Sequence, residues 1–206
     1  NNKEFKIKDL INYSTTLYEE QSFKFTNKSA QKELTDFLLD RLKYYMREKN
    51  IRSDIIDASL NFFGINEITK IYKKSVVLNK YINKEIGINI VSSYKRASNI
   101  LSHELNNKEL EISNSIDPVL FKSEYEKKLY KKIHELRKYF TSINRDENYD
   151  LTLKNLADSK KVIFEFFDNV KVNDEDKTIK KNRLELLNLF CRTFDNYILF
   201  SSIESL

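Results

Sequence analysis

The sequence contains few of the residues that end helices or form tight turns. Among its 206 residues the strong breakers are two glycines, Gly64 and Gly87, and one proline, Pro118. An all-β sandwich or barrel needs turn residues between its strands, and a Gly-rich phosphate-binding loop needs several closely spaced glycines. Neither can be built from this composition. The sequence therefore predicts an all-α fold.

Cysteine and histidine are also scarce, which limits the chemistry that the chain can support. The one cysteine, Cys191, cannot form an internal disulfide, and two histidines with one cysteine cannot assemble a typical zinc site. His103 is not followed by a second histidine four residues on, and His134 lies alone on a lysine-rich segment. Cys191 lies on an apolar stripe, where we expect it to be a small buried hydrophobe. The sequence thus predicts neither catalytic residues nor a metal site.

Long apolar runs are missing as well. No run approaches the roughly 20 residues that span a bilayer, and residues 1–8 lack the apolar core of a signal peptide. We therefore expect a soluble, cytoplasmic protein. Because the chain begins at Asn1 without a methionine, we also expect it to be a piece of a longer polypeptide.

What the sequence does contain is a helical spacing of apolar residues along most of its length. Hydrophobic residues make up 40% of the chain, which is enough for a core. They recur every three or four residues, as expected for amphipathic helices with one buried face. The predicted helices span about residues 7–18, 34–46, 53–63, 68–87, 90–101, 123–140, 153–170 and 177–194. Ser53 is expected to cap the third helix and Gly64 to end it, while Gly87 is expected to end the fourth.

Polar segments separate these helices. The apolar spacing fails between Asn106 and Asp117, which predicts the longest loop. Residues 123–126 have the pattern of a capping box, in which a serine and a glutamate satisfy backbone donors at the start of a helix. The acidic residues within 173–176 suit the positive end of the last helix.

Positive charge is in modest excess and is gathered in short clusters. The chain has 36 Lys and Arg against 31 Asp and Glu, a net charge of +5. Pairs of basic residues recur beside tyrosines, as in the segments 94–96 and 127–132. Lysine and arginine could neutralise phosphates, and tyrosine could stack on unpaired bases. For each cluster, a solvated helix face is the alternative.

Three motifs in the second half of the chain carry a family resemblance. They are Lys95-Arg96-Ala97-Ser98-Asn99-Ile100-Leu101, Phe166-Phe167-Asp168-Asn169-Val170-Lys171-Val172 and Asn182-Arg183-Leu184-Glu185-Leu186-Leu187. In order and spacing, these motifs resemble the C-terminal part of bacterial glycyl-tRNA synthetase beta subunits. Upstream, residues 37–42 and 51–58 resemble the segment of that family that leads into its anticodon-binding region.

This resemblance implies a helical connector in residues 1–90 and an α-helical anticodon-binding bundle in residues 91–206, similar to the bundle of arginyl-tRNA synthetases. It implies a part in the ligase that joins glycine to its tRNA with ATP. In that family the enzyme is an alpha2beta2 tetramer, and the separate alpha subunit would hold ATP and Mg. The present piece would bind glycine tRNA and hold no cofactor. A helical scaffold that docks subunits without touching RNA is the alternative.

The motifs and the basic clusters together suggest RNA-binding residues: Lys95, Arg96, Lys160, Lys161, Asn169, Lys180 and Arg183. For Arg96, an ion pair within the bundle is the alternative to a phosphate contact. Glycine codons begin with GG, so the tRNA presents two cytosines in its anticodon loop. Their exocyclic amines are donors that Asp or Glu can accept, while Tyr stacks on the base. The sequence does not identify which carboxylate or tyrosine does so.

Overall fold

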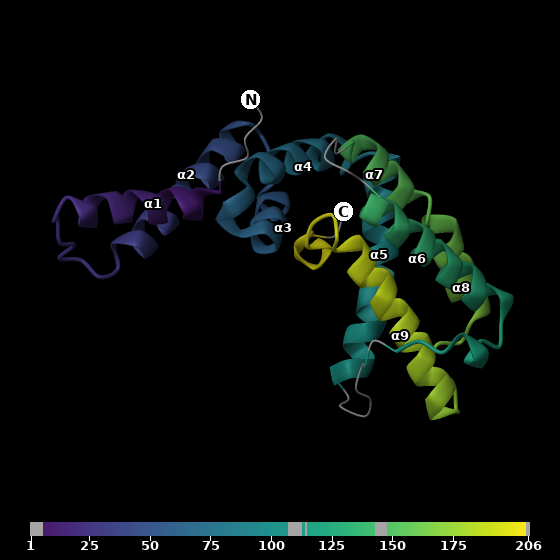
Figure 1. The fold of residues 1–206 in the computed structure, drawn as a ribbon. Helices are drawn as coiled ribbons and strands as arrows, with labels where there is room; N and C mark the ends of the chain where they lie inside the picture. The colour runs from purple at the N-terminus through teal and green to yellow at the C-terminus, as the bar shows by residue number, and fades with distance from the viewer. Residues whose placement is uncertain (1–5, 107–112, 114, 143–147, 205–206) are drawn as a thin grey trace. The chain divides into compact units, whose positions relative to one another are not determined.

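The computed structural model describes residues 6–106, 113, 115–142 and 148–204, and the regular structure within these ranges is helical (Figure 1). The predicted all-α fold is confirmed. Among the described residues, no helix is both long and apolar enough to cross a membrane. The helices gather into two compact units, residues 1–79 and residues 80–206.

The first unit is built around the buried side chains of three helices. It contains α1 (Ile7–Glu20), α2 (Ala30–Glu48), α3 (Ser53–Phe63), the 3-10 turn η1 (Gly64–Glu67) and most of α4 (Ile68–Tyr81). Met46 of α2, Ile55 of α3 and Ile71 of α4 are fully buried. The buried hydroxyls of Ser59 and Ser75 hydrogen-bond to each other at 2.7 Å, which satisfies two polar groups inside the core.

Helix α1 forms where the apolar spacing predicts it, but it buries less than expected. The sequence predicts one buried apolar face. Within the described residues Ile11 is buried, whereas Leu10, Leu17 and Tyr18 are 43%, 37% and 53% exposed. Periodicity predicts that a helix has an apolar stripe, and it carries no information on whether another element covers that stripe.

The ends of α3 confirm one expectation and correct another. Ser53 is the first residue of the helix, and Arg52 occupies the capping position without a side-chain capping bond, so the predicted cap by Ser53 is wrong. The side chain of Asn79 instead accepts a hydrogen bond from the backbone N–H of Arg52 at 3.1 Å. At the other end Gly64 adopts a φ of 60°, which confirms that a left-handed glycine ends the helix.

Gly87 has a different role from the predicted one. It was expected to end the fourth helix, but α4 ends at Tyr81 and Gly87 lies inside α5 (Glu85–Asn106). A Cβ at this position would lie 2.4 Å from the carbonyl oxygen of Tyr81 and 2.5 Å from the Cα of Ile82. Glycine is needed here because the end of one helix approaches the start of the next too closely for any side chain.

The second unit is a bundle with a ring of four helices. It contains α5, α6 (Glu124–Ser142), α7 (Tyr149–Ala157), α8 (Lys160–Asn169), α9 (Lys177–Phe194) and the 3-10 turns η2 (Pro118–Leu120) and η3 (Phe200–Ser202). Helix α5 packs on α9, α9 on α6, α6 on α8, and α8 on α5, while α7 packs on α5 (Figure 1). Fully buried aromatic side chains fill the interior: Phe166, Phe190, Phe194, Tyr197 and Phe200. The α5–α8 and α6–α9 seams therefore lie on opposite sides of the ring.

Helices α7 and α8 replace the single long helix that the sequence predicts over residues 153–170. The helix is interrupted at Asp158 and Ser159, where the buried Ser159 hydroxyl donates a hydrogen bond to the carbonyl oxygen of Leu156 at 2.6 Å. Leu156 and Ile163 are both fully buried on either side of the break. Seven residues are about two helical turns, so the apolar spacing continues across the break and hides it.

The predicted helix starts in this unit are confirmed. The Glu126 carboxylate accepts from the backbone N–H of Ser123 at 2.7 Å, and the Ser123 hydroxyl accepts from that of Tyr125 at 3.2 Å, as in a capping box. Asp176 precedes α9 and accepts from the N–H of Thr178 at 2.8 Å. The predicted loop at 106–117 lies mostly outside the described residues.

The two compact units divide between Asn79 and Lys80, whereas the sequence places the change from connector to bundle between residues 90 and 91. That position falls inside α5, which runs unbroken from Glu85 to Asn106 and packs on α7, α8 and α9. The first turns of α5 therefore belong structurally to the bundle. The functional division into a connector in residues 1–90 and an anticodon-binding bundle in residues 91–206 stays a prediction.

Candidate nucleic-acid interface

Arg96 lies in the α5–α8 seam and is held by side chains of α8. Its guanidinium carbon is 4.5 Å from the ring centroid of Phe167 and 5.2 Å from that of Phe164. The guanidinium also pairs with the Asp168 carboxylate at 3.6 Å. Cation–π and ionic contacts together hold the guanidinium within the bundle, which is the alternative that the sequence left open for this residue. Nearby, Lys160 donates to the side chain of Asn89 at 2.8 Å.

Three further residues suggested by the sequence remain accessible on this side of the bundle. Lys161 is exposed, and among the described residues its one ion pair is a long contact of 3.9 Å with Glu165. Asn169 is exposed, and its side chain donates to the backbone carbonyl of Glu165. Lys95 is half-buried, and in the described part of the chain it forms no ion pair. Of the suggested lysines and arginines, Lys95 and Lys161 are the ones that a phosphate could approach without displacing a partner held at short range.

Lys180 forms an ion pair inside the bundle. Its ammonium group contacts the Glu104 carboxylate at 2.6 Å, with both side chains largely buried, and so ties α9 to α5. The hydrogen bond from Lys180 holds the pKa of Glu104 below its ordinary value. A phosphate could bind Lys180 only by breaking this pair.

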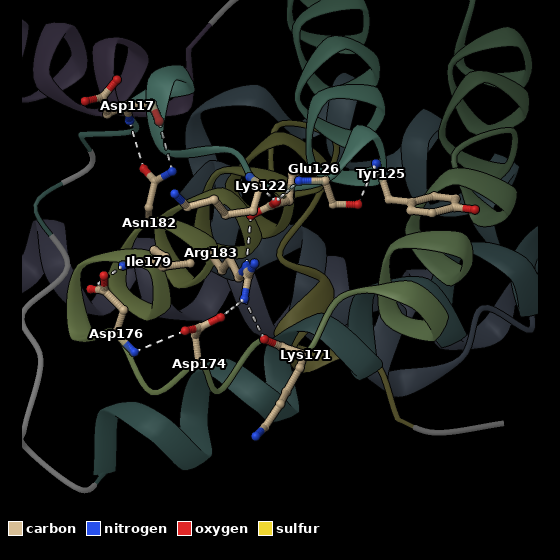
Figure 2. A network of polar contacts seen from close by, with 11 residues as sticks. Asp117, Lys122, Tyr125, Glu126, Lys171, Asp174, Asp176, Ile179, Asn182 and Arg183 are labelled. Carbon is tan, nitrogen blue, oxygen red and sulfur yellow. Dashed lines mark hydrogen bonds and ion pairs between the residues drawn. The ribbon is translucent and has the colours of Figure 1, made fainter.

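Arg183 is the centre of a polar network that joins α9 to α6 (Figure 2). Its side chain is 7% exposed, and Nε donates to the fully buried Glu126 carboxylate at 2.9 Å. Nη1 donates to Asp174 at 2.7 Å and to the backbone carbonyl of Lys171 at 2.9 Å. The guanidinium is thereby committed to internal acceptors, which makes its role in this structure architectural.

The neighbouring Asn182 fixes the chain that leads into α6. Its amide oxygen accepts from the backbone N–H of Asp117 at 2.8 Å, and its amide nitrogen donates to the carbonyl of the same residue at 3.0 Å (Figure 2). Glu126, held by Arg183, accepts from the backbone N–H groups of Lys122 and Ser123. Asn182 and Arg183 thus set the position of the segment before α6 and of the helix's first turn.

A cavity of about 130 Å³ lies in the α6–α9 seam, and we call it the α6–α9 pocket. Tyr130, His134 and Arg137 of α6 line one side, and Glu185 and Asn188 of α9 line the other, with Ile116 closing part of the wall. Glu185 is 1% exposed, whereas His134 and Arg137 are exposed. The pocket therefore has a buried carboxylate at depth and cationic or titratable groups at its rim.

The side chains of the pocket are arranged in an ordered way. The rings of Tyr130 and His134 lie edge to face with centroids 4.3 Å apart, and Phe121 supports Tyr130 at 5.4 Å. Glu185 accepts hydrogen bonds from the backbone N–H of Ser113 and from its hydroxyl, the latter at 2.9 Å. The aromatic wall is thus packed from behind, and the carboxylate is held in place.

Helix α6, which forms one wall of this pocket, also carries basic side chains without ion-pair partners among the described residues. The outer face of α6 carries Lys131, Lys132, Arg137 and Lys138, and within the described ranges no ion pair involves any of them. Lys127, by contrast, pairs with Glu124 at 2.7 Å. Free cations beside a pocket that contains aromatic rings form a combination suited to single-stranded nucleic acid.

The sequence contained part of the signal for this pocket. Tyr130, His134 and Arg137 are spaced by four and three residues and so share one helix face, and the basic cluster beside Tyr130 was a sequence candidate. Glu185 and Asn188 were not candidates, because only the packing of α9 against α6 brings them to the same place. His134, which lies alone on a lysine-rich segment of the sequence, is exposed and lines the pocket.

The described residues contain no group of three or more metal-ligating side chains close enough together to hold a metal ion. Burial raises the pKa of the Cys191 thiol, as it does for a sulfur packed in a core.

Comparison with known proteins shows which proteins the chain resembles. Residues 90–200 match the family described as the DALR anticodon binding domain. The glycine–tRNA ligase beta subunit of Rickettsia canadensis is 30% identical over 203 residues, and that of Rickettsia felis is 32% identical over 201 residues. These matches cover 98% and 97% of the chain but 28% and 27% of the relatives. A beta subunit from Cereibacter sphaeroides is 29% identical over 157 residues, 76% of this chain and 22% of its own length.

Proposed function

Since residues 90–200 make this chain a member of the DALR anticodon binding domain family, we propose that it binds the anticodon arm of glycine tRNA as part of a glycyl-tRNA synthetase beta subunit. The observation that carries this proposal is the α6–α9 pocket with the unpaired cations of α6 beside it. Aromatic and acidic groups in a pocket suit a base, and the lysines on the helix that forms one of its walls suit phosphates.

The chain spans little more than a quarter of the length of the curated relatives that it matches, 28% of the Rickettsia canadensis beta subunit. We propose that the whole enzyme attaches glycine to tRNA with ATP, in an alpha2beta2 assembly whose alpha subunit holds ATP and Mg. The contribution of this chain would be to bind and orient the tRNA. In this proposal, the described residues of the chain take no part in the chemical steps that attach glycine to tRNA.

Two surfaces are candidates for the phosphate contacts. The first is the outer face of α6, and the second is the α5–α8 seam with Lys95, Lys161 and Asn169. We propose the first, because Lys131 and Lys138 have no ion-pair partner among the described residues and follow the pocket residues Tyr130 and Arg137 in the chain, whereas Lys161 is paired, although loosely, with Glu165. The two seams lie on opposite sides of the four-helix ring, so one bound loop would not cover both.

The test is a titration of the chain into labelled glycine tRNA, and into a copy with both anticodon cytosines replaced, across a range of salt. Specific recognition predicts tighter binding to the native anticodon at every salt concentration. Equal and steeply salt-dependent binding would mean a nonspecific phosphate surface. Absence of binding would favour the helical scaffold that docks subunits without touching RNA.

Matched variants then distinguish the surfaces. Lys131→Gln with Lys138→Gln, and Lys95→Gln with Lys161→Gln, each remove two positive charges. We expect the α6 pair to lower the salt dependence of binding by about one unit of slope per lost phosphate contact. The α5–α8 pair should leave the slope unchanged. The reverse result would place the RNA on the α5–α8 seam.

A further inference from the structure

The exposed apolar side chains of this protein are concentrated on α1, α2 and the loop between them. Among the described residues, fifteen large hydrophobic side chains are exposed, and ten of them lie within residues 10–45. Single exposed hydrophobic residues are normal on a protein surface, whereas a group of them marks a surface that binds another molecule. The first unit therefore carries a candidate interaction surface that is separate from the α6–α9 pocket.

Helix α2 has two apolar faces, and one of them is uncovered. Met46 is fully buried on the face toward the core. On the other face, Leu34, Phe37 and Tyr44 are 45%, 53% and 57% exposed. With the exposed Arg41 among them, these residues are three, four and three positions apart, which is the spacing of a coiled-coil seam. We call Leu34, Phe37, Arg41 and Tyr44 the α2 stripe. It lies about a third of a turn away from Met46 around the helix.

The α2 stripe is complementary to itself when two copies of the helix run antiparallel. With the pair centred near Leu39, Leu34 of one copy faces Tyr44 of the other, and both are apolar. Phe37 then faces Arg41 of the other copy. The Arg41 guanidinium already lies 5.2 Å from the Phe37 ring centroid within one helix, and such cation–π contacts are favourable between helices as well. Self-complementarity is the property that a two-fold symmetric interface requires.

The charged residues beside the stripe select the same antiparallel pairing. Glu33 and Arg47 are exposed on one edge of the stripe, and the pairing brings Glu33 of each copy beside Arg47 of the other. Within its own copy, Glu33 accepts a hydrogen bond from the uncharged side chain of Asn27 at 3.0 Å. The two Asp40 carboxylates approach each other at the centre, next to the two Arg41 guanidiniums, so the centre carries no net charge. A parallel pair would instead place Arg41 opposite Arg41.

We propose that the α2 stripe is a contact surface for a second copy of this chain, bound antiparallel. This inference does not depend on RNA binding. A large aromatic side chain buries about 150–250 Å², so four half-exposed side chains provide about 400 Å² per copy. A standard interface uses about 800 Å² per partner. We therefore expect a weak dimer, with a dissociation constant in the micromolar range.

Sedimentation equilibrium of the whole chain, at concentrations from about 1 to 200 μM, measures this dissociation constant. The wild-type chain should change from monomer to dimer as its concentration rises. Glu33→Arg and Arg47→Glu each place like charges side by side at both ends of the pair, so each should weaken the dimer at least about tenfold. The variant that carries both changes restores opposite charges and should recover the wild-type value within about threefold.

Lys32→Glu is the matched control for Arg47→Glu. It makes the same change of charge on an exposed residue of α2, but on the opposite side of the helix from the α2 stripe. The control should leave the dissociation constant unchanged. Thermal unfolding verifies that each variant is folded, which is expected because all three positions are exposed.

A wild-type chain that stays monomeric over the whole concentration range would overturn the proposal. A dimer that tolerates both single charge reversals would overturn it too, as would a double variant that does not recover. Each of these results would leave the proposed function untouched. Failure of the wild-type chain to bind glycine tRNA would overturn the proposed function and leave the dimer contact untouched.

Discussion

At the scale of single residues, burial separates two kinds of basic side chain that look alike in the sequence. Arg183 has both of its ionic partners inside the second unit, at 2.9 Å from Glu126 and 2.7 Å from Asp174. Arg137 is exposed at the rim of the α6–α9 pocket. Both are arginines on amphipathic helices of the α6–α9 seam, and the difference is that Arg183 has carboxylates packed against it whereas Arg137 lies at the exposed end of its pocket.

Replacing Arg183 by leucine should strongly destabilise the protein. Glu126 would be left buried without its cation, and breaking a buried ion pair by removing one partner costs about 3–5 kcal/mol. The free energy of unfolding in urea measures the loss. Adding Glu126→Gln to the Arg183→Leu variant should recover part of it, because the buried charge is then gone. A loss below about 1 kcal/mol in the single variant would mean that water reaches the pair.

Cys191 should be chemically inert in the folded protein. Its side chain is buried and burial raises the pKa of the thiol, so the reactive thiolate is scarce. We expect the native protein to react with a thiol reagent at least about a hundredfold more slowly than the urea-unfolded chain. Similar rates in the two states would show that the surrounding core opens readily.

At the scale of helices and their junctions, close packing decides features that propensity leaves open. Gly87 sits within the first turn of α5, where helix propensity alone would favour alanine by about 1 kcal/mol. The backbone of Tyr81 and Ile82 lies within 2.5 Å of where a Cβ would stand. Helix propensity would make alanine at this position stabilising, and the steric clash would make it destabilising. The change in the free energy of unfolding on a single substitution therefore shows which effect is larger.

The variant Gly87→Ala should therefore be less stable, by about 1–3 kcal/mol, because the added methyl group forces backbone apart. Thermal unfolding provides the measurement. Asn99→Ala is the control, since Asn99 is an exposed residue of the same helix and alanine there should be neutral or slightly stabilising. Stabilisation by Gly87→Ala would mean that the α4–α5 junction relaxes without cost.

At the scale of the whole molecule, carboxylates with lowered pKa values make the fold sensitive to acid. Hydrogen bonds from Lys180 to Glu104, from Tyr81 to Asp150, and from the backbone of Asp176 to Asp174 hold these three pKa values below their ordinary range. Asp195 acts in the opposite sense, because burial raises its pKa and its ionised form is disfavoured. Lowered carboxyl pKa values stabilise the folded state above the ordinary pKa, and this stabilisation disappears as the pH falls through the folded-state value.

The variant Glu104→Gln should accordingly be less stable than the wild-type chain at pH about 7, where Glu104 is ionised and paired with Lys180. The difference should shrink as the pH falls below about 4, because the wild-type carboxyl then takes up a proton as well. Urea unfolding at a series of pH values measures it, with the exposed Glu175→Gln as the control. A difference that is independent of pH would contradict an ionic role for Glu104.

The sequence by itself determined the helical class and the helix starts at the capping box and at Asp176, because scarce helix breakers, apolar spacing and side-chain caps act over a few neighbouring residues. It also determined the family, because the motifs that carry the resemblance are short stretches of sequence. Only the tertiary structure decided the break at Ser159, the close approach at Gly87, the internal use of Lys180 and Arg183, and the meeting of Tyr130 with Glu185 in one pocket. Each of these depends on which helix packs against which, since burial and partners belong to pairs of elements far apart along the chain.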